Sequence, residues 1–340
     1  MCIRDSNSIA NTDTHEVEIM VLEKYIDIVL LTCFIGINIA IAMVLAPLLD
    51  GVERKIRARL QNRKGPPITQ TIYDLSKLYK KKSSATSRLH ALLPYIAFVH
   101  VAIALAFLPS VLRASISVYG DVVLFIYLVS ASVVYIAIGS IASGNPFAGI
   151  GASREISMLM IIEFIFALIA STLAITHRTL VLSNILPMNI YMDKPPFLKP
   201  SLIVLVVILA ILIYIESLRF PFELAEAEPE LASGILIEYG GPHLATVLYT
   251  LLLRRYLLLT FLIDLILPRD TIASLLSIEI PLIPIGIDAI VFIVLLFILT
   301  ILFSSIEAFF GRYRIDIALR FMKKILLISF VVIILALIGF

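Results

Sequence analysis

Charged residues are scarce in this chain of 340 residues. Only 15% of its residues are charged, whereas 60% are hydrophobic, and the mean hydropathy is +1.04. A water-soluble domain carries about 25% charged residues and cannot cover its surface with so few. The shortage excludes an ordinary soluble enzyme. It also excludes a disordered chain, because disordered chains are poor in apolar residues.

Cysteine and histidine, the usual ligands of metal centres, are also scarce. The chain has two cysteines, Cys2 and Cys33, and five histidines. An iron–sulfur cluster needs about four thiolates, and a structural zinc ion needs about four Cys or His ligands. The sequence also has no P-loop and no GxGxxG motif before a helix. We therefore expect this chain to bind no metal, cofactor or nucleic acid, and any redox centre to lie on another chain.

Long apolar runs are abundant instead. A bilayer core about 30 Å thick is crossed by roughly 20 helical residues, and these runs are far too long for barrel strands. The sequence therefore predicts an all-α membrane protein in which residues 21–340 form a single bundle of eight transmembrane helices. The expected spans are about 25–49, 89–112, 121–143, 155–177, 200–217, 242–267, 285–309 and 322–340.

Basic residues are distributed unequally between the connections. The segment 50–88 alone holds eleven Lys and Arg residues, and eighteen of the 27 lie on its side of the membrane against seven on the other. Cytoplasmic loops are enriched in Lys and Arg. We therefore expect a multi-pass protein of the cell membrane with both termini outside and two long cytoplasmic loops, the first at 50–88 and the third at 216–241.

The first twenty residues differ from the rest of the chain. They are polar and lack the basic-then-apolar order of a signal peptide. We interpret residues 1–20 as a non-native or disordered leader, with Met20 as a credible start.

The first cytoplasmic loop combines positive charge with an amphipathic pattern. After the rigid break at Gly65-Pro66-Pro67, apolar residues recur at helical spacing at Ile72, Leu75, Leu78 and Tyr79. This spacing predicts an interfacial helix near 71–82, with Asp74 and Lys77 off the apolar stripe. Such a helix could line a cavity or dock a partner. The alternative is a basic loop attracted to anionic lipid headgroups.

The third cytoplasmic loop is acidic. Between Glu216 and Tyr239 it holds one Arg, no Lys and six carboxylates: Glu216, Glu223, Glu226, Glu228, Glu230 and Glu238. A solvated loop is one interpretation, but apolar residues alternate closely with the acids, so some carboxylates should pack against the bundle. Burial and crowding raise the pKa of a carboxyl group, and groups in that state exchange protons readily.

Further ionisable residues fall within the expected spans. They are Glu163, Arg254, Arg255, Asp264, Asp288 and Glu307. Charges at this depth usually face the bundle interior or a water-filled path. We interpret Glu163 and the acidic loop as a proton or ion path. The other charges could be structural, with Arg254 pairing with Glu163 or a loop acid.

Motifs in these segments resemble one known family. The runs Glu53-Arg54-Lys55 and Arg63-Lys64-Gly65-Pro66 are similar to the first cytoplasmic loop of the membrane subunit of respiratory complex I that holds the quinone cavity, often called subunit 1. The runs from Arg219 to Glu226 and Ile237-Glu238-Tyr239 resemble its acidic loop, and Gly149 to Glu163 resembles the segment leading into its fourth core helix. The resemblance extends over residues 25 to 340.

Three other short motifs resemble those of one branch of this family. Gly65-Pro66-Pro67, Tyr73-Asp74-Leu75 and Ser153-Arg154-Glu155 are similar to the homologous subunit of energy-converting membrane-bound nickel–iron hydrogenases and formate hydrogenlyases. The resemblance implies a non-catalytic coupling subunit of a group 4 membrane-bound hydrogenase-type complex, linked to ferredoxin or formate. Its partners would be hydrogenase-like large and small subunits that carry the nickel–iron and iron–sulfur centres, antiporter-like membrane subunits and the lipid bilayer.

The resemblance also implies roles for the matching residues. A proton or sodium path would use Glu155, Glu163, Glu216, Glu223, Glu226, Glu228, Glu230 and Glu238. The loop that borders the cavity and contacts the peripheral arm would use Arg54, Arg59, Arg63, Asp74, Lys77 and Arg219.

Two other functions stay open. The chain could be the quinone-cavity subunit of an NADH:quinone oxidoreductase, which would bind quinone. A stand-alone secondary transporter would also carry charged helices, although the eight expected spans show no internal repeat and the acidic loop lies away from the midplane.

Overall fold

The computed structural model of the chain describes residues 6–83, 85–108, 111, 120–186, 199–226, 228–266 and 282–339. The regular structure of these residues is helical, apart from an isolated bridge between Asp121 and Val181. The helices are α1 (Ser6–Leu60), α2 (Gln70–Tyr79), α3 (Arg88–Ala106), α4 (Val122–Ile141), α5 (Pro146–His177), α6 (Leu182–Ile185), α7 (Pro200–Glu216), α8 (Glu228–Leu231), η2 (Gly234–Leu236), α9 (Gly241–Ile266), α11 (Leu282–Phe309) and α12 (Ile315–Ile338).

Seven helices of the described residues are long and apolar enough to cross a membrane. They lie within α1, α3, α4, α5, α9, α11 and α12. The expected fifth span, 200–217, is α7, which has 17 residues and ends where polar residues begin at Glu216. It falls short of the roughly 20 residues that cross a bilayer core. The all-α membrane fold is confirmed, the number of eight spans is not, and the orientation stays a prediction.

Two helices extend further than hydropathy predicts. Helix α1 continues to Leu60, so the first part of the expected loop 50–88 is helical, and α5 begins at Pro146 rather than near residue 155. The side chain of Asn145 accepts a hydrogen bond from the backbone N–H of Phe147, which caps the start of α5. The extra turns hold charged side chains that form ion pairs with other segments, so a charge there does not end the helix.

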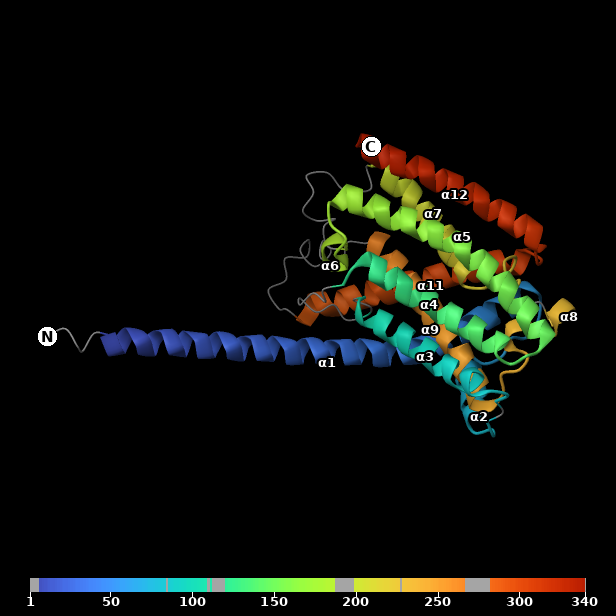
Figure 1. The fold of residues 1–340 in the computed structure, drawn as a ribbon, viewed down its shortest axis with the longest axis horizontal. Coiled ribbons are helices and arrows are strands. Elements are labelled where there is room, and N and C mark those ends of the chain that lie inside the picture. Colours follow the sequence, from blue (N-terminus) through green and yellow to red (C-terminus); the bar gives the residue numbers. More distant parts are fainter. Residues whose placement is uncertain are drawn as a thin grey trace.

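Helix α9 lies at the centre of the bundle (Figure 1). It contacts α1, α2, α3, α7 and α11, and 72% of its membrane window is buried, the largest share of the seven. By contrast, α11 and α12 expose large apolar side chains along their length, as expected where lipid replaces water. The N-terminal part of α1 extends away from the bundle in Figure 1. Side chains of α1, α2, α7 and α11 can therefore meet around α9, near the end of α9 that follows the acidic loop.

Gly51 allows the connection between α1 and α2 to return close to α1. A Cβ added to Gly51 would lie 1.8 Å from the backbone oxygen of Ile68. We expect Gly51→Ala to displace this connection and lower the free energy of unfolding by about 1–3 kcal/mol, as overpacking does. The thermal midpoint of the detergent-solubilised protein measures the loss. Gly36→Ala in the same helix is the matched control, because nothing lies within 4 Å of its added Cβ; an equal loss in both variants would contradict the prediction.

Candidate functional site

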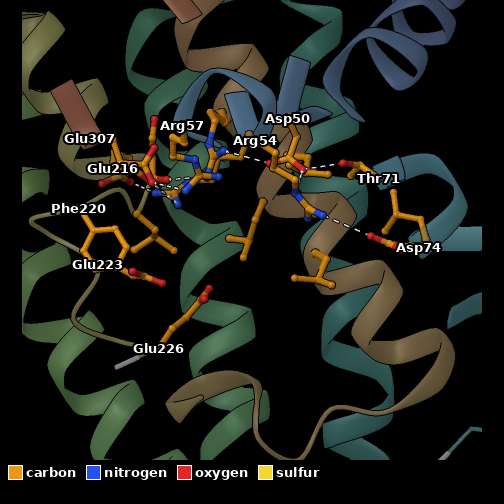
Figure 2. Close-up of a pocket in the computed structure, with 18 residues that line it drawn as sticks. Asp50, Arg54, Arg57, Thr71, Asp74, Glu216, Phe220, Glu223, Glu226 and Glu307 are labelled. Atoms are coloured by element: carbon orange, nitrogen blue, oxygen red, sulfur yellow. Dashed lines mark hydrogen bonds and ion pairs between the residues drawn. The ribbon is translucent and has the colours of Figure 1, made fainter. Parts of the chain in front are cut away.

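A cavity of about 220 Å³ lies where α1, α7, α9 and α11 meet α2 and the acidic loop (Figure 2). Ten of its eighteen lining residues are ionisable: Asp50, Arg54, Arg57, Asp74, Glu216, Glu223, Glu226, Arg254, Arg255 and Glu307. Within the described residues no set of three or more His, Cys, Asp or Glu side chains is placed to hold a metal ion. Apolar side chains such as Phe220, Leu248 and Leu252 complete the lining between these charges.

Alternating charges connect α2 with α1 and α9 on one side of the cavity. Arg54 on α1 lies 3.3 Å from Asp74 on α2 and 2.8 Å from Asp50, one turn earlier on its own helix. Asp50 also accepts a hydrogen bond of 2.7 Å from the hydroxyl of Thr71 and lies 3.7 Å from Arg255 on α9. Helix α2 is therefore held against the cavity by polar contacts.

The same alternation continues toward α11. Arg255 donates to Glu53 at 2.8 Å, and the other carboxylate oxygen of Glu53 pairs with Arg219 of the acidic loop. Glu307 on α11 lies 3.7 Å from Arg219 and 2.6 Å from Arg57. These contacts join four cations and four anions, so the network is electrically balanced. Its members are Arg54, Arg57, Arg219, Arg255, Asp50, Glu53, Asp74 and Glu307.

Arg219 and Glu53 form the most deeply buried part of this network, since each side chain is 1% exposed. Burial lowers the pKa of the Arg219 guanidinium, while Glu53 and Glu307 act in the opposite direction. Arginine nevertheless stays charged in proteins. Its guanidinium also lies over the ring of Phe303, 5.6 Å from the centroid. Arg219 thus fixes the start of the acidic loop between α1 and α11.

A second group of charges surrounds Arg254, which is 2% exposed on α9. Arg254 pairs with the carboxylate of Glu216, the last residue of α7, and donates to its backbone oxygen at 3.3 Å. Its charge also attracts Glu155 and Glu163 of α5. Among the described residues, one oxygen of the buried Glu155 has no hydrogen-bond partner, whereas the half-buried Glu163 has the Ser130 hydroxyl beside its carboxyl group. The single positive charge of Arg254 therefore interacts with three carboxyl groups, but it can neutralise only one negative charge.

Three of the six predicted loop acids gather at the cavity. They are Glu216, Glu223 and Glu226, and the latter two point into it in Figure 2. Glu223 lies 3.3 Å from Arg312, whose guanidinium stacks over the ring of Phe220. The conformation of the acidic loop therefore places three of its six acids at the cavity.

The other three acids do not line the cavity. Glu238 accepts a hydrogen bond of 2.6 Å from Asn145. Glu230, with 61% of its side chain exposed, pairs with Arg154 at 2.9 Å. The side chain of Glu228 lies outside those that the structure describes. Their predicted place in an ion path stays a prediction.

The six residues predicted to border the cavity and contact the peripheral arm also divide into two groups. Arg54 and Asp74 line the cavity and Arg219 is buried beside it, whereas three others are exposed and do not line it: Arg59, Arg63 and Lys77. The buried side chains of α2 are Thr71 and Leu75, while Ile72 is exposed. The helix predicted near 71–82 is present as α2, with Leu75 of its apolar stripe buried and Tyr79 exposed, and its position at the membrane interface stays a prediction.

Sequence reasoning did not assign Asp50, Glu53 and Arg57 to the site. These residues recur at i, i+3 and i+7 at the end of α1, so they share one helix face. Charges with that spacing directly after an apolar run were the signal that could have found them. The sequence identifies Arg255 and Glu307 as charges within the expected spans but does not assign them to the cavity.

Comparison with known proteins adds independent information. Residues 32–338 match the protein family described as NADH dehydrogenase. Hydrogenase-4 component C of Escherichia coli (strain K12) is 32% identical over 244 residues, which is 67% of this chain and 73% of that protein. Formate hydrogenlyase subunit 4 of the same organism is 30% identical over 236 residues, covering 68% of this chain and 76% of the relative.

Two further relatives extend the comparison. In the NADH-quinone oxidoreductase of Rickettsia africae (strain ESF-5), the subunit called H is 32% identical over 203 residues, or 56% of this chain and 58% of that protein. A chain in the solved structure of the membrane-bound sulfane sulfur reductase, an archaeal respiratory membrane complex, has a TM-score of 0.79 and 26% identity. That match covers 90% of this chain and 99% of the other.

Proposed function

Because the chain belongs to the NADH dehydrogenase family, which includes a subunit of NADH-quinone oxidoreductase, we propose that it is the ion-translocation coupling subunit of a group 4 membrane-bound hydrogenase-type complex. Its relatives are subunits or components of multisubunit oxidoreductases. In this proposal the redox centres lie on cytoplasmic partner subunits. This chain holds those subunits at the membrane and passes protons or sodium ions toward antiporter-like neighbours.

The observation that carries the proposal is the sharing of Arg254 by three carboxyl groups. Glu155 and Glu216 are buried and Glu163 is half-buried. A carboxylate that is taken out of water without a counter-charge is costly, so one guanidinium stabilises only one of the three as an anion. The other two hold a proton or a bound cation. A proton that moves between these groups changes which of them Arg254 neutralises, and the cluster can therefore pass ions on.

The positions of these groups support a direction for the path. Glu216 and Glu226 lie at the cavity, and Glu155 follows on α5 within reach of the Arg254 charge. Glu163 lies eight residues further along α5, about 12 Å at the rise of an α-helix. The path therefore runs from the cavity into the span.

The lining of the cavity favours a hydrogenase-type complex over a quinone-binding one. Ten ionisable residues line a volume of about 220 Å³. Sites for organic ligands occupy about 300–1,000 Å³ and are lined mostly by apolar and aromatic side chains. A quinone ring would replace water around charged groups here without matching them.

Purification of the native complex through an affinity tag on this chain tests the proposal. We expect nickel and iron in the co-purifying subunits, and electron transfer that depends on hydrogen, formate or reduced ferredoxin. FMN together with NADH oxidation that quinone analogues inhibit would instead identify the quinone-cavity subunit. Ion transport by the chain alone, without partners, would identify a stand-alone transporter.

A further inference from the structure

The connection between α11 and α12, residues 310–314, packs against the acidic loop. The backbone N–H of Tyr313 donates to the carbonyl oxygen of Pro221 at 2.9 Å. The Tyr313 ring meets the ring of Phe222 edge to face, with centroids 5.7 Å apart and planes inclined by 86°. Phe222 is buried and also contacts Phe321 of α12, at 5.5 Å between centroids. The middle of the acidic loop is therefore attached to α12 and to the connection that precedes it.

Arg312 in this connection reaches two residues that line the cavity. Its guanidinium lies over the ring of Phe220, 5.3 Å from the centroid, and its Nη2 lies 3.3 Å from a carboxylate oxygen of Glu223. Phe220 and Glu223 stand on either side of Pro221 and Phe222 in the sequence, and both line the cavity (Figure 2). A planar guanidinium that stacks on one residue and pairs with another restricts the direction of both. Arg312 therefore determines where the Glu223 carboxylate points.

The partial burial of this pair makes the contact stronger than one on an open surface. The side chains of Arg312 and Glu223 are each 18% exposed. Water screens a fully exposed ion pair, which then contributes little, whereas a pair that is mostly removed from water is screened less. Loss of Arg312 would leave the Glu223 carboxylate short of both water and a counter-charge.

Other cations of the cavity would then attract Glu223. Four arginines line the cavity and each is already paired with an acid on a helix: Arg54, Arg57, Arg254 and Arg255. A carboxylate released from Arg312 would be drawn toward these arginines and would compete with the acids that hold them. Arg312, which comes from outside the balanced network, thus supplies Glu223 with a separate counter-charge.

We propose that Arg312 is a positioning residue that holds the Glu223 carboxylate at the wall of the cavity and apart from the arginines of the buried network. Its effect on ion movement rests on the proposed function, because it acts through Glu223. The attachment of the acidic loop to the α11–α12 connection does not depend on that function.

Hydrogen–deuterium exchange of the purified whole complex tests the attachment. In Arg312→Gln we expect the amides of peptides covering 219–226 and 310–314 to exchange about fivefold faster or more, because the charged contact that joins them is lost. Arg314→Gln is the matched control, since Arg314 lies in the same connection but is 84% exposed and 3.9 Å from Asp316. Unchanged exchange in Arg312→Gln, or an equal increase in both variants, would overturn the proposal. If Arg312→Gln does not assemble, Glu223→Gln breaks the same pair from the other side, and unchanged exchange in that variant would overturn it equally.

A double-mutant cycle in proteoliposomes tests the positioning role. We expect Arg312→Gln to lower the ratio of ions moved to electrons transferred, Arg312→Lys to recover most of it by keeping the charge, and Arg312→Gln to cause no further loss when Glu223→Gln is already present. Additive losses, or a lysine variant as impaired as the glutamine variant, would overturn the role through Glu223.

The two measurements separate failure of this role from failure of the proposed function. If Arg312→Gln and Glu223→Gln leave the ion-to-electron ratio unchanged while Glu163→Gln lowers it, the positioning role is wrong and the ion path stands. If Glu163→Gln and Glu226→Gln also leave the ratio unchanged, the proposed ion path is wrong. Hydrogen–deuterium exchange decides in either case whether Arg312 holds the acidic loop.

Discussion

Replacing Glu163 by Gln is expected to abolish most ion translocation by the assembled complex while electron transfer in the peripheral arm continues. Glu163 lies furthest along the proposed path of the three carboxyl groups that share Arg254, and Gln keeps its size but cannot take up or release a proton. The ratio of ions moved to electrons transferred should fall about tenfold or more, the effect of adding about 1.4 kcal/mol to the barrier.

The measurement uses the complex in proteoliposomes, with the ion gradient and electron transfer followed together. Asp316→Asn is the control, because Asp316 is 62% exposed at the start of α12 and lies 3.9 Å from Arg314. We expect Glu226→Gln, at the cavity, to act in the same direction as Glu163→Gln. Unchanged ion transport in both glutamine variants would contradict the proposed path.

The sequence predicted the helical fold well because lipid leaves few alternatives. A run of about 20 apolar residues between polar segments is a helix almost by necessity, and seven such helices are present in the described residues. Hydropathy predicted the ends of helices poorly where charged residues begin. It ended the first helix near residue 49, yet α1 continues to Leu60, where Asp50, Glu53 and Arg57 pair with an arginine and a glutamate of other helices.

The site was predictable only in part for a related reason. Acids in an apolar setting identified Glu163, Glu216 and the acidic loop, but their partners come from distant parts of the chain. Glu53 and Arg219 are separated by 166 residues, and Arg57 and Glu307 by 250. No local pattern encodes such pairs. The conformation that directs Glu223 to the cavity and leaves Glu230 exposed arises from tertiary packing.

Removing the charge of Arg219 should have the largest effect on stability. Arg219→Gln leaves the network with three cations and four anions, and Glu53 and Glu307 are nearly fully buried. Breaking a buried ion pair by removing one partner costs about 3–5 kcal/mol, because the remaining charge is left in a medium of low polarity. Most domains are stable by only about 5–15 kcal/mol. We therefore expect little assembled complex in membranes from cells that express Arg219→Gln.

Arg154→Gln provides the matched control, since it also breaks an arginine–glutamate pair. The Glu230 side chain in that pair is 61% exposed, and exposed pairs contribute about 0–1 kcal/mol. The amount of assembled complex and its thermal midpoint in detergent measure both variants. If burial of the charge is the cause, Arg219→Gln loses far more than Arg154→Gln, and adding Glu53→Gln to Arg219→Gln recovers part of the loss by restoring three cations against three anions. Equal losses in the two single variants, or no recovery in the double variant, would show that the network does not depend on charge balance.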